Sequence, residues 1–589
     1  MPFETIAKPA ATALSVSPNI SDYEAQRASF QWDDIAKELD GLPGGGPSTG
    51  SEQALNIAYE AIDRHVAKGH GSRSAILWEG KNGEQETYTF EDLMKLSNRW
   101  CSVLRNLGVK KGDRVFVFLD RIPELYGAVF GTLKAGCVIG PLFSAFGPDA
   151  VKDRLENSGA VLLLTSPDLW RKIAAIRGDL PALKHVVHVQ HGTRIQASDG
   201  ILSYDDLMDG TSDDAAIERT GLEDPSIMHY TSGTTGKPKG AVHVHQAVWG
   251  HYATGKYVLD LRHSDIYWCT ADPGWVTGTS YGMFAPFTNG VTSVIYEGGF
   301  SASKWYEIIQ KYKVTVWYTA PTAIRLLMKA GDEIPKRYDL SSLRYTMSVG
   351  EPLNPEAVVW GERVLGLPFH DNWWQTETGS IMIANYPTMP IKPGSMGKPM
   401  LGINPGIIDE DGNELPPGQE GDLAVRPGWP SMFRTYWQDE ERYNSRFRNG
   451  WYLSGDRARK DEDGYFWFIG RADDVINTAG HLVGPFEVES ALIEHPAVAE
   501  AGVIGKPDPV AMEIVKAFVA LKDGFEQSDQ LRRELIGFAR DKLGPGVAPR
   551  EIDFVPTLPK TRSGKIMRRL LKARELGLPE GDISTLEED

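Results

Sequence analysis

Hydrophobic and polar positions follow two different periods along most of the chain. Apolar side chains recur at the spacing of an amphipathic helix in residues 92–107 and 123–134, whereas residues 114–119 and 160–165 are short apolar runs typical of buried strands. Two more such runs occupy residues 314–318 and 344–349. Strands that alternate with helices predict an α/β architecture with mainly parallel sheets.

The pattern changes after about residue 400. Acidic, glycine-containing turns at residues 409–414 and 461–466 predict short strands joined as hairpins, and we expect a small antiparallel, β-barrel-like unit over about residues 400–472. Beyond Gly470 the pattern predicts a compact α+β domain. Its expected elements are a helix, two strands, a helix and a strand, at residues 486–494, 499–504, 514–521, 528–542 and 551–555.

A chain of 589 residues exceeds what one hydrophobic core can serve, so several structural units are expected. Residues 1–50 are predicted to be a loosely structured lead-in that ends in the Gly/Pro-rich run 42–48. The large N-terminal domain is expected over residues 51–472 and the small C-terminal domain over residues 473–589.

The composition is that of a globular protein, with 41% hydrophobic and 24% charged residues. A formal charge of −17 predicts a surface that repels nucleic acid and anionic membranes, so anionic ligands need local basic sites. Cys101, Cys137 and Cys269 are few, odd in number and far apart, which argues against disulfides and favours a reducing compartment. Neither a secretory signal nor a membrane-spanning run is visible, so we expect a cytoplasmic protein.

The most informative segment is residues 230–240, with the sequence YTSGTTGKPKG. Glycines let backbone N–H groups approach an anion closely, while the hydroxyls and two lysines add donors and positive charge. The segment is not a Walker A loop, because Pro238 follows Gly236-Lys237 where Ser or Thr is required. We therefore predict a phosphate-binding loop, and a flexible surface loop is the alternative.

Other segments carry candidate chemistry. Residues 371–379, preceded by 349–352, combine a carboxylate with hydroxyls, which suits Mg²⁺ on nucleotide phosphates; the alternative is that the two tryptophans of this segment are core residues. Asp456, in a Ser-Gly-Asp turn, is suited to bind a ribose, and Arg471 is suited to reach the same nucleotide. An aspartate in such a turn is more often structural.

The segment 558–569 is basic, and residues 560–574 include seven lysines or arginines and no acid. A solvated helix face is the default explanation of such a run. Lys565, however, follows a Ser-Gly turn that presents it singly, as a charge that acts on a transferring phosphoryl group must be.

In order and spacing, these segments resemble the adenylate-forming enzymes, and in particular the AMP-forming acetyl-CoA synthetases (acetate–CoA ligases). The resemblance extends from about residue 50 to the end of the chain and includes residues 268–278, 484–490 and 581–586. It implies ATP, Mg²⁺ and coenzyme A as ligands, a mobile C-terminal domain and two steps. Acetate attacks the α-phosphorus of ATP to give acetyl-AMP and pyrophosphate, and the CoA thiol then displaces AMP.

The resemblance also implies roles for individual residues. Lys565 matches the lysine that stabilises adenylation, Glu377 the Mg²⁺ partner, and Asp473 the hinge of the C-terminal domain. The implied nucleotide contacts are Thr231, Ser232, Gly233, Thr234 (also near the metal through ATP), Thr235, Gly236, Lys237, Lys239, Gly350, Glu351, Pro352, Asp371, Asn372, Trp373, Trp374, Gln375, Thr376, Asp456 and Arg471. The implied CoA contacts are Thr277, Ala479 and Arg540. Some relatives bind a structural cation at the positions of Ile493, His495 and Val498, and a loop without metal is the alternative.

The implied acyl pocket is lined by Val276, Thr277, Val349 and Trp374. Longer-chain members of the family carry a small residue at the position of Trp374, so an indole there implies space for acetate or propionate. The implied partners are these small molecules, with neither nucleic acid nor membrane. A monomer and a homo-oligomer both remain open.

Two departures from the family pattern concern anion binding. Leu482 stands where an arginine is usual, and Ala511-Met512 replaces a basic residue followed by glycine. Each lost charged hydrogen bond weakens the binding of an anion by about 1.5–3 kcal/mol. The alternative functions are another short-chain acyl-CoA ligase, a peptide-synthetase adenylation module, a luciferase-like oxidase and a nucleotide or acyl-CoA sensor without activity. Because both half-reactions are reversible, net flux toward ATP is a further alternative.

Overall fold

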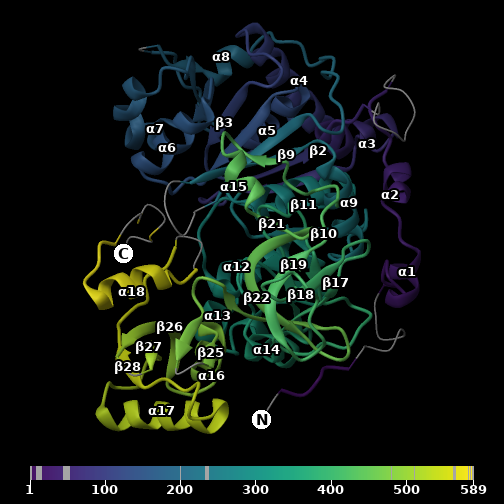
Figure 1. Ribbon diagram of the computed structural model, residues 1–589. Coiled ribbons are helices and arrows are strands. Elements are labelled where there is room, and N and C mark those ends of the chain that lie inside the picture. Colours follow the sequence, from purple (N-terminus) through teal and green to yellow (C-terminus); the bar gives the residue numbers. More distant parts are fainter. Residues whose placement is uncertain are drawn as a thin grey trace.

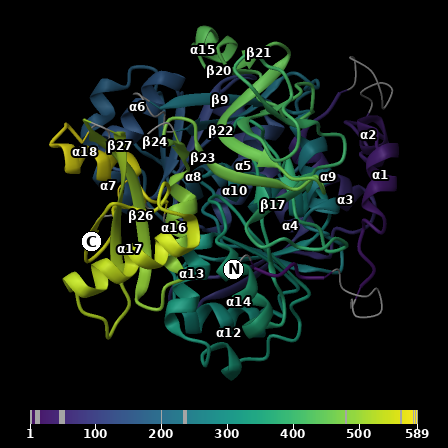
Figure 2. The same ribbon diagram turned by 60° about the horizontal axis from the view of Figure 1, so that its bottom comes forward.

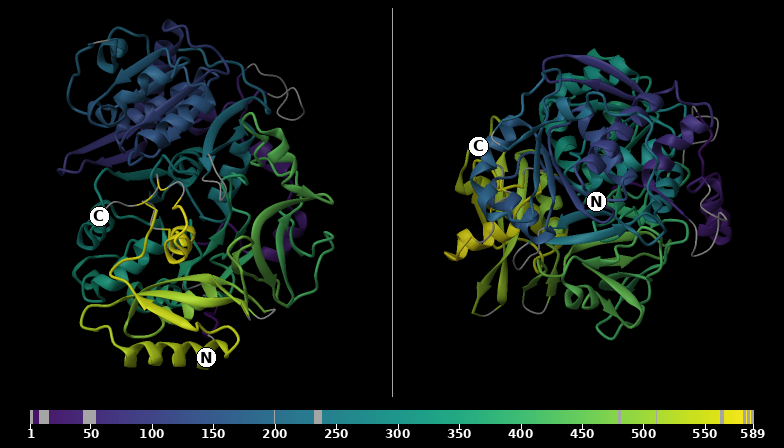
Figure 3. Two further views of the ribbon diagram at one scale, coloured as in Figure 1. Left: turned by 60° about the vertical axis from the view of Figure 1, so that its left-hand side comes forward. Right: turned by 90° about the horizontal axis from the view of Figure 1, so that it is seen from above.

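The structure is a computed structural model that describes residues 3–7, 16–43, 54–198, 200–231, 238–478, 481–509, 511–561, 565–580, 583 and 586. Three sheets form a large N-terminal part, and a fourth sheet forms a small C-terminal part (Figure 1). Figures 2 and 3 show the C-terminal part, coloured yellow, against one side of the N-terminal part. None of the described helices has both the length and the apolar character needed to cross a membrane.

The first sheet lies at the top of Figure 1 and has the order β20-β9-β8-β4-β3-β5-β6-β7. Its strands are β3 (Arg114–Phe118), β4 (Val138–Leu142), β5 (Leu162–Thr165), β6 (His185–His188), β7 (Leu202–Ser203), β8 (Pro225–Thr231), β9 (Lys239–Val244) and β20 (Thr435–Tyr436). The pairs from β8 to β7 are parallel, and β9 and β20 extend the edge in antiparallel fashion.

The second sheet has the order β14-β13-β12-β10-β11-β1-β2 and is parallel except for the β1–β2 hairpin. Its strands are β1 (Ser74–Glu79), β2 (Gln85–Thr89), β10 (Ile266–Cys269), β11 (Thr292–Tyr296), β12 (Val316–Thr319), β13 (Tyr345–Ser348) and β14 (Phe369–His370). Both sheets confirm the predicted α/β class with mainly parallel pairing.

Helices connect and cover these strands. They are α3 (Arg64–Ala67), α4 (Phe90–Asn106), α5 (Pro123–Lys134), α6 (Pro148–Ser158), α7 (Pro167–Ile173), α8 (Tyr204–Met208), α9 (Ala247–Tyr257), α10 (Val276–Thr279), α11 (Ala285–Thr288), α12 (Ala302–Tyr312), α13 (Pro321–Ala330), α14 (Pro355–Leu365) and α15 (Glu440–Asn444). The sequence fixes several of their starts: proline opens α5, where its missing N–H costs nothing, and Thr89 with Asp92 forms a capping box on α4.

The third sheet is antiparallel and has the order β15-β16-β17-β23-β22-β19-β18, with β21 paired to β22. Its strands are β15 (Asn372–Trp373), β16 (Ile383–Ala384), β17 (Ser395–Pro399), β18 (Pro405–Ile408), β19 (Glu420–Val425), β21 (Phe447–Arg448), β22 (Trp451–Lys460) and β23 (Phe466–Arg471). The predicted hairpin turns join β18 to β19 and β22 to β23. The expected barrel-like closure is not found among the described strands, because β15 and β18 lie at opposite ends of the sheet.

The C-terminal part contains β24 (Ile476–Thr478), β25 (His481–Val483), α16 (Pro485–Ile493), β26 (Val498–Asp508), β27 (Met512–Leu521), α17 (Asp529–Leu543), β28 (Glu551–Phe554) and α18 (Arg568–Leu576). This agrees with the predicted order, and the basic tail adds the helix α18. Leu535 of α17 packs with Val503 and Val519, whereas Leu571 of α18 packs with Ile504 and Phe518. Successive strand residues face opposite sides, so α17 and α18 cover opposite faces of this sheet.

The described part of the lead-in is more ordered than predicted. Helices α1 (Tyr23–Ser29) and α2 (Trp32–Glu38) lie along one side of the N-terminal part (Figure 1). Tyr23, Ile35 and Ala36 of these helices, together with Ile20 and Leu39, are buried in the largest core cluster. The sequence did not predict these helices because their apolar faces are too short to show a helical period. Most of the predicted flexible run, residues 44–48, lies outside the described residues.

Candidate active site

The predicted nucleotide residues lie where neighbouring parallel strands end. β12, β13 and β14 are adjacent, and the segment Val349–Pro352 follows β13 while Asp371 follows β14. Ligands of open α/β sheets bind outside the carboxyl ends of the strands, where loops from adjacent strands converge. Gly350 has φ +95°, a conformation that glycine adopts without strain, so this residue lets the chain turn at the strand end.

Asp371 and Asn372 are buried beneath this edge. The Asp371 carboxylate accepts the N–H of Asn372 at 2.9 Å, and burial raises its pKa to about 8. The Asn372 amide donates to the carbonyl of Ser348 at 2.6 Å and accepts the hydroxyl of Tyr318 at 3.1 Å. These bonds tie together the ends of β12, β13 and β14, so both side chains hold the floor of the site.

Asp456 lies against the segment that contains Trp373 and Gln375. Its Oδ2 accepts the indole N–H of Trp373 at 2.9 Å and the amide of Gln375 at 3.0 Å, and the guanidinium of Arg471 lies 3.3 Å from its Oδ1. Burial raises the pKa of Asp456, while the charge of Arg471 opposes that rise. Trp373 is also a core residue, so its packing and polar roles coexist.

Glu377 is oriented by a residue of β20, a contact that the sequence analysis did not predict. The hydroxyl of Tyr436 on β20 donates to Glu377 Oε1 at 2.7 Å, and Lys239 lies over the Tyr436 ring at 5.6 Å. Burial, and then the charges of Arg442 and Arg446, lower the pKa of Lys239. Several cations and the carboxylates of Glu377 and Asp439 therefore face the same region, which suits phosphates with Mg²⁺.

His243 was also missed by sequence reasoning. One ring nitrogen lies 2.8 Å from the carbonyl of Thr376 and the other lies 3.0 Å from that of Ser431. Burial lowers its pKa to about 4, so the ring is neutral and donates to one of the two carbonyls. No local pattern marks Tyr436 or His243, because they meet the 371–379 segment only through pairing of β9 with β20.

The phosphate-binding loop connects β8 to β9. Thr231 and Lys239 pair across this hairpin, so the two ends of the loop are fixed next to each other. Ser232, Gly233, Thr234, Thr235, Gly236 and Lys237 lie outside the described residues. Lys239, at the C-terminal end of the loop, lies near Tyr436, because β20 pairs with β9.

Lys565 stands at the end of a small hairpin in the C-terminal part. Thr561 donates its N–H to the Lys565 carbonyl at 2.7 Å and accepts the Lys565 N–H on its hydroxyl at 3.1 Å. Lys565 lines a cavity of about 50 Å³ with Glu351 and Pro352. The Lys565 side chain is exposed, but neighbouring protein atoms partly desolvate it. This desolvation and then the charges of Arg471 and Arg568 lower its pKa. The carboxylates of Asp456 and Asp474 oppose this shift.

The predicted acyl-pocket residues come from three elements. Val349, after β13, is buried, and Trp374 packs edge-to-face on Tyr281 with ring centroids 5.0 Å apart. Val276 and Thr277 open α10, which runs into the turn that carries Tyr281. A Cβ at Gly278 would lie 2.0 Å from the carbonyl of Asp272, so only glycine fits there.

The predicted CoA contacts are not brought together in this orientation of the C-terminal part. Arg540 is exposed on α17, on the sheet face opposite α18, and Thr277 lies in the N-terminal part. Ala479 lies outside the described residues. Asp473 lies in the turn between β23 and β24 and accepts a hydrogen bond from Arg471 at 3.5 Å.

The predicted cation loop is closed by internal bonds. The carbonyl of His495 accepts the N–H of Val498 at 3.0 Å, and its ring contacts Glu534 at 3.2 Å. Among the described residues no cluster of three His, Cys, Asp or Glu side chains is arranged for a metal ion. The structural cation site at Ile493, His495 and Val498 stays a prediction.

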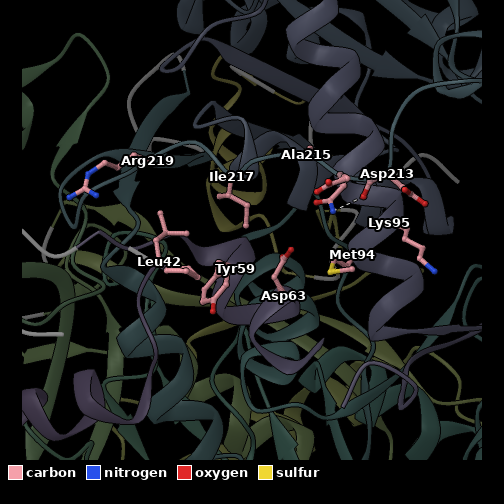
Figure 4. Close-up of a pocket in the computed structure, with 12 residues that line it drawn as sticks. Leu42, Tyr59, Asp63, Met94, Lys95, Asp213, Ala215, Ile217 and Arg219 are labelled. Atoms are coloured by element: carbon pink, nitrogen blue, oxygen red, sulfur yellow. Dashed lines mark hydrogen bonds between the residues drawn. The ribbon is translucent and has the colours of Figure 1, made fainter. Parts of the chain in front are cut away.

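A second, larger cavity of about 600 Å³ lies elsewhere in the N-terminal part (Figure 4). Leu42, Tyr59, Asp63, Met94 and Ile217 are among its lining residues. None of the predicted site residues that the structure describes lines it, and it is separate from the strand ends discussed above.

Two family models match the chain. The model of the AMP-binding enzyme matches residues 63–437, and that of the AMP-binding enzyme C-terminal domain matches residues 487–565. This chain belongs to the AMP-binding enzyme family. The first match includes the segment 371–379, and the second spans α16 to the Lys565 hairpin, whereas Asp456 and Arg471 lie between the two matches.

Individual AMP-binding enzymes are similar over nearly the full length. An acetyl-coenzyme A synthetase of Bacillus subtilis (strain 168) is 53% identical over 578 residues, which cover 98% of this chain and 99% of that protein. An acetyl-coenzyme A synthetase of Pyrobaculum aerophilum is 44% identical, covering 91% of this chain and 85% of that protein.

Solved structures agree with the fold. A crystal structure of a Brucella canis acyl-CoA synthetase has a TM-score of 0.73 and 36% identity, covering 95% of this chain and 99% of that chain. A crystal structure of an anthranilate CoA ligase in complex with anthranoyl-AMP has a TM-score of 0.83 and 30% identity, covering 92% of this chain and 99% of that chain.

Proposed function

We propose that this protein is an AMP-forming acetate–CoA ligase. It activates acetate with ATP and Mg²⁺ to acetyl-AMP, releases pyrophosphate and transfers the acetyl group to coenzyme A. The observation that carries the proposal is the convergence of Lys565, Asp456 and the Glu351 loop on one interdomain space, in a chain 53% identical to an acetyl-coenzyme A synthetase.

The charges support the first half-reaction. Burial, and then the charges of Arg471 and Arg568, lower the pKa of Lys565, so an anion placed among the three cations would relieve their repulsion. A pentavalent α-phosphoryl group carries negative charge on its oxygens, and a fixed cation stabilises that charge. In this proposal Lys565 performs this step and Asp456 holds the ribose hydroxyls.

The pyrophosphate end is assigned to the region around Glu377. Lys239, Arg442 and Arg446 supply positive charge there, and Glu377 is the carboxylate that would hold Mg²⁺, whose other ligands would be phosphate oxygens and water. The metal neutralises phosphate charge when it is bound. Tyr436 keeps Glu377 oriented, because its hydroxyl donates to one carboxylate oxygen.

The size of the proposed acyl pocket determines which acid we assign as the substrate. In this proposal the indole of Trp374, which packs on Tyr281, limits the acyl side to a short chain. Acetate is the proposed substrate, and propionate is the next acid in size.

The second half-reaction requires a different orientation of the C-terminal part. Arg540 and Lys565 lie on opposite faces of its sheet, so rotation about Asp473 would withdraw the lysine and present the face that carries Arg540 to Thr277. We place the domain boundary at this hinge. A cytoplasmic location agrees with three cysteines that are all free.

The test has two parts. Wild-type protein with acetate, ATP and Mg²⁺ is expected to exchange labelled pyrophosphate into ATP, and coenzyme A is expected to elicit AMP formation. Lys565→Ala is expected to lose about 10²–10³-fold in exchange rate, the usual effect of removing one stabilising donor from a transition state.

Lys572→Ala is the matched control, because Lys572 lies on α18 in the same basic segment and pairs with Glu513. It should keep wild-type exchange. Wild-type protein that binds ATP without exchange would favour the sensor alternative, whereas full exchange by Lys565→Ala would refute the assigned role of this lysine alone.

A further inference from the structure

The two parts of the molecule are joined by a hydrogen bond between Asn354 and Ser490. Asn354 immediately precedes α14 in the N-terminal part, and Ser490 lies on α16 in the C-terminal part. The amide Nδ2 of Asn354 donates to the Ser490 hydroxyl at 3.0 Å. Asn354 is 4% exposed, so water competes little for this bond. Figures 1 and 2 show α16 beside α13 and α14.

The position of Asn354 makes this contact informative. Asn354 is the N-cap residue of α14, and asparagine at an N-cap usually accepts an N–H from the first helical turn. Its side chain makes no such bond here. The amide is turned toward the other part of the molecule instead of toward its own helix.

Arg325 fixes the orientation of that amide. A guanidinium only donates, so the Asn354 oxygen faces Arg325 Nη1 at 3.3 Å and the amide nitrogen is left to face Ser490. Arg325 is held in turn by Glu351, at 3.0 Å from its Nη2. Asn354 is therefore oriented by the loop that carries the predicted nucleotide contacts Gly350, Glu351 and Pro352.

On the other side, α16 is linked to the hairpin of Lys565. Glu489, next to Ser490, accepts two hydrogen bonds from Arg568, at 2.8 and 2.5 Å. It also accepts the N–H of Val503 at 2.9 Å, so the buried carboxylate is fixed within its own domain. Arg568 opens α18, which directly follows Lys565. Arg325, Glu351, Asn354, Glu489, Lys565 and Arg568 all line one cavity.

We infer that the Asn354–Ser490 hydrogen bond is a positioning contact that selects the orientation of the C-terminal domain in which Lys565 faces the nucleotide residues. The inference rests on the proposed function, because it assumes that acetyl-AMP formation and thiol transfer use different orientations. The bond joins residues on opposite sides of the Asp473 hinge, so a rotation that withdraws Lys565 also breaks it. It should therefore favour the first half-reaction only.

The test separates the two half-reactions. Ser490→Ala removes the acceptor from a half-buried position with little risk to folding. We expect about a threefold to tenfold loss in the rate of acetate-dependent pyrophosphate exchange, the effect of one hydrogen bond. The rate of acetyl-CoA formation from supplied acetyl-AMP and coenzyme A should stay at the wild-type value. Ser341→Ala is the control, since the Ser341 hydroxyl bonds Asp339 on the surface of the N-terminal part.

Asn354→Ala provides the second measurement. If the two side chains act through one bond, the double variant should exchange pyrophosphate no more slowly than the slower single variant. Equal losses in both half-reactions, or exchange by Ser490→Ala at the wild-type rate, would overturn the inference. Absence of exchange in the wild-type protein would instead refute the proposed function, so the two failures are distinguishable.

Discussion

Trp374 shows how one side chain sets the size of the proposed acyl pocket. Its indole is half-buried and packs edge-to-face on Tyr281, whose hydroxyl accepts the N–H of Ile381 at 2.7 Å. The ring beneath the indole is thus fixed by the core. A smaller residue at this position would leave a space that the neighbouring side chains cannot fill.

Trp374→Gly is expected to shift acid preference from acetate toward butyrate and longer acids. Each methylene that enters the new space gains about 0.8 kcal/mol, or roughly a fourfold rise in kcat/KM. The measurement is kcat/KM for a series of straight-chain acids. Trp374→Phe, which keeps a ring on Tyr281, should retain the preference for acetate, and an unchanged series for Trp374→Gly would rule out the pocket assignment.

Among individual site residues, sequence analysis singled out those in a distinctive short segment and missed those in ordinary strands. The Ser-Gly-Asp segment that contains Asp456 and the isolated Lys565 are recognisable from a few neighbours, although Asp456 lies inside β22 and not in the predicted turn. Tyr436 belongs to a two-residue strand, and His243 lies in an apolar strand where a histidine has no distinctive spacing. Both meet Glu377 and Thr376 only because separate strands pair in three dimensions.

Among the elements, β2, α5 and the loop after β6 are joined by His191. Its Nδ1 lies 2.9 Å from Glu124 of α5 and its Nε2 lies 3.2 Å from Glu86 of β2. Hydrogen bonding and attraction to Glu124, followed by Glu86, outweigh burial and raise the pKa of His191 from 6.5 to about 9. The protonated ring therefore links three elements of the N-terminal part.

This pKa predicts how stability depends on pH. The pKa is higher in the folded state, so the stabilisation is fully present below pH 6.5 and is lost as pH rises through about 9. We expect the free energy of unfolding to fall by roughly 2 kcal/mol over this range, as one charged hydrogen-bond pair is lost. Urea unfolding at a series of pH values measures it.

His191→Gln cannot take up the proton, so its unfolding free energy should lack this decrease. The exposed His70 provides the control, and His70→Gln should retain the wild-type pH profile. A decrease of the same size in His191→Gln would show that other groups cause it.

Element prediction succeeded for helices of several turns and for short apolar strands. Helices α4 and α5 and strands β3 and β28 lie within a few residues of their predicted bounds. It failed for α1 and α2, each only seven residues long, because so short a segment shows too few periods to distinguish helix from loop. The third sheet begins at Asn372, before the predicted start near residue 400, because strands of two residues carry no pattern.

The whole molecule has one feature that no single element reveals. Lys565 and Arg540 lie on opposite faces of the C-terminal sheet, and Lys565 is the one that faces Asp456 in this structure. The backbone that would permit an exchange of faces passes through Asp473, between β23 and β24. Position 473 has no positive φ, and no hydrogen bond of the described residues uses its N–H.

Asp473→Pro should therefore restrict rotation, since proline fixes φ near −65°. Asp473 is the third residue of a turn that the Asp474 N–H closes on the Arg471 carbonyl, and proline there disfavours the αR conformation of Ala472, so the present orientation is slightly strained as well. We expect acetate-dependent pyrophosphate exchange to fall about threefold from this strain, because the lost Arg471–Asp473 bond is long and weak. Overall acetyl-CoA synthesis should fall at least about tenfold, because the thiol-transfer orientation becomes rare.

Asp473→Ala loses the same carboxylate but keeps the backbone free, so it should retain overall synthesis. If Asp473→Pro formed acetyl-CoA as fast as Asp473→Ala, rotation at this position would be unnecessary and the hinge would have to lie elsewhere.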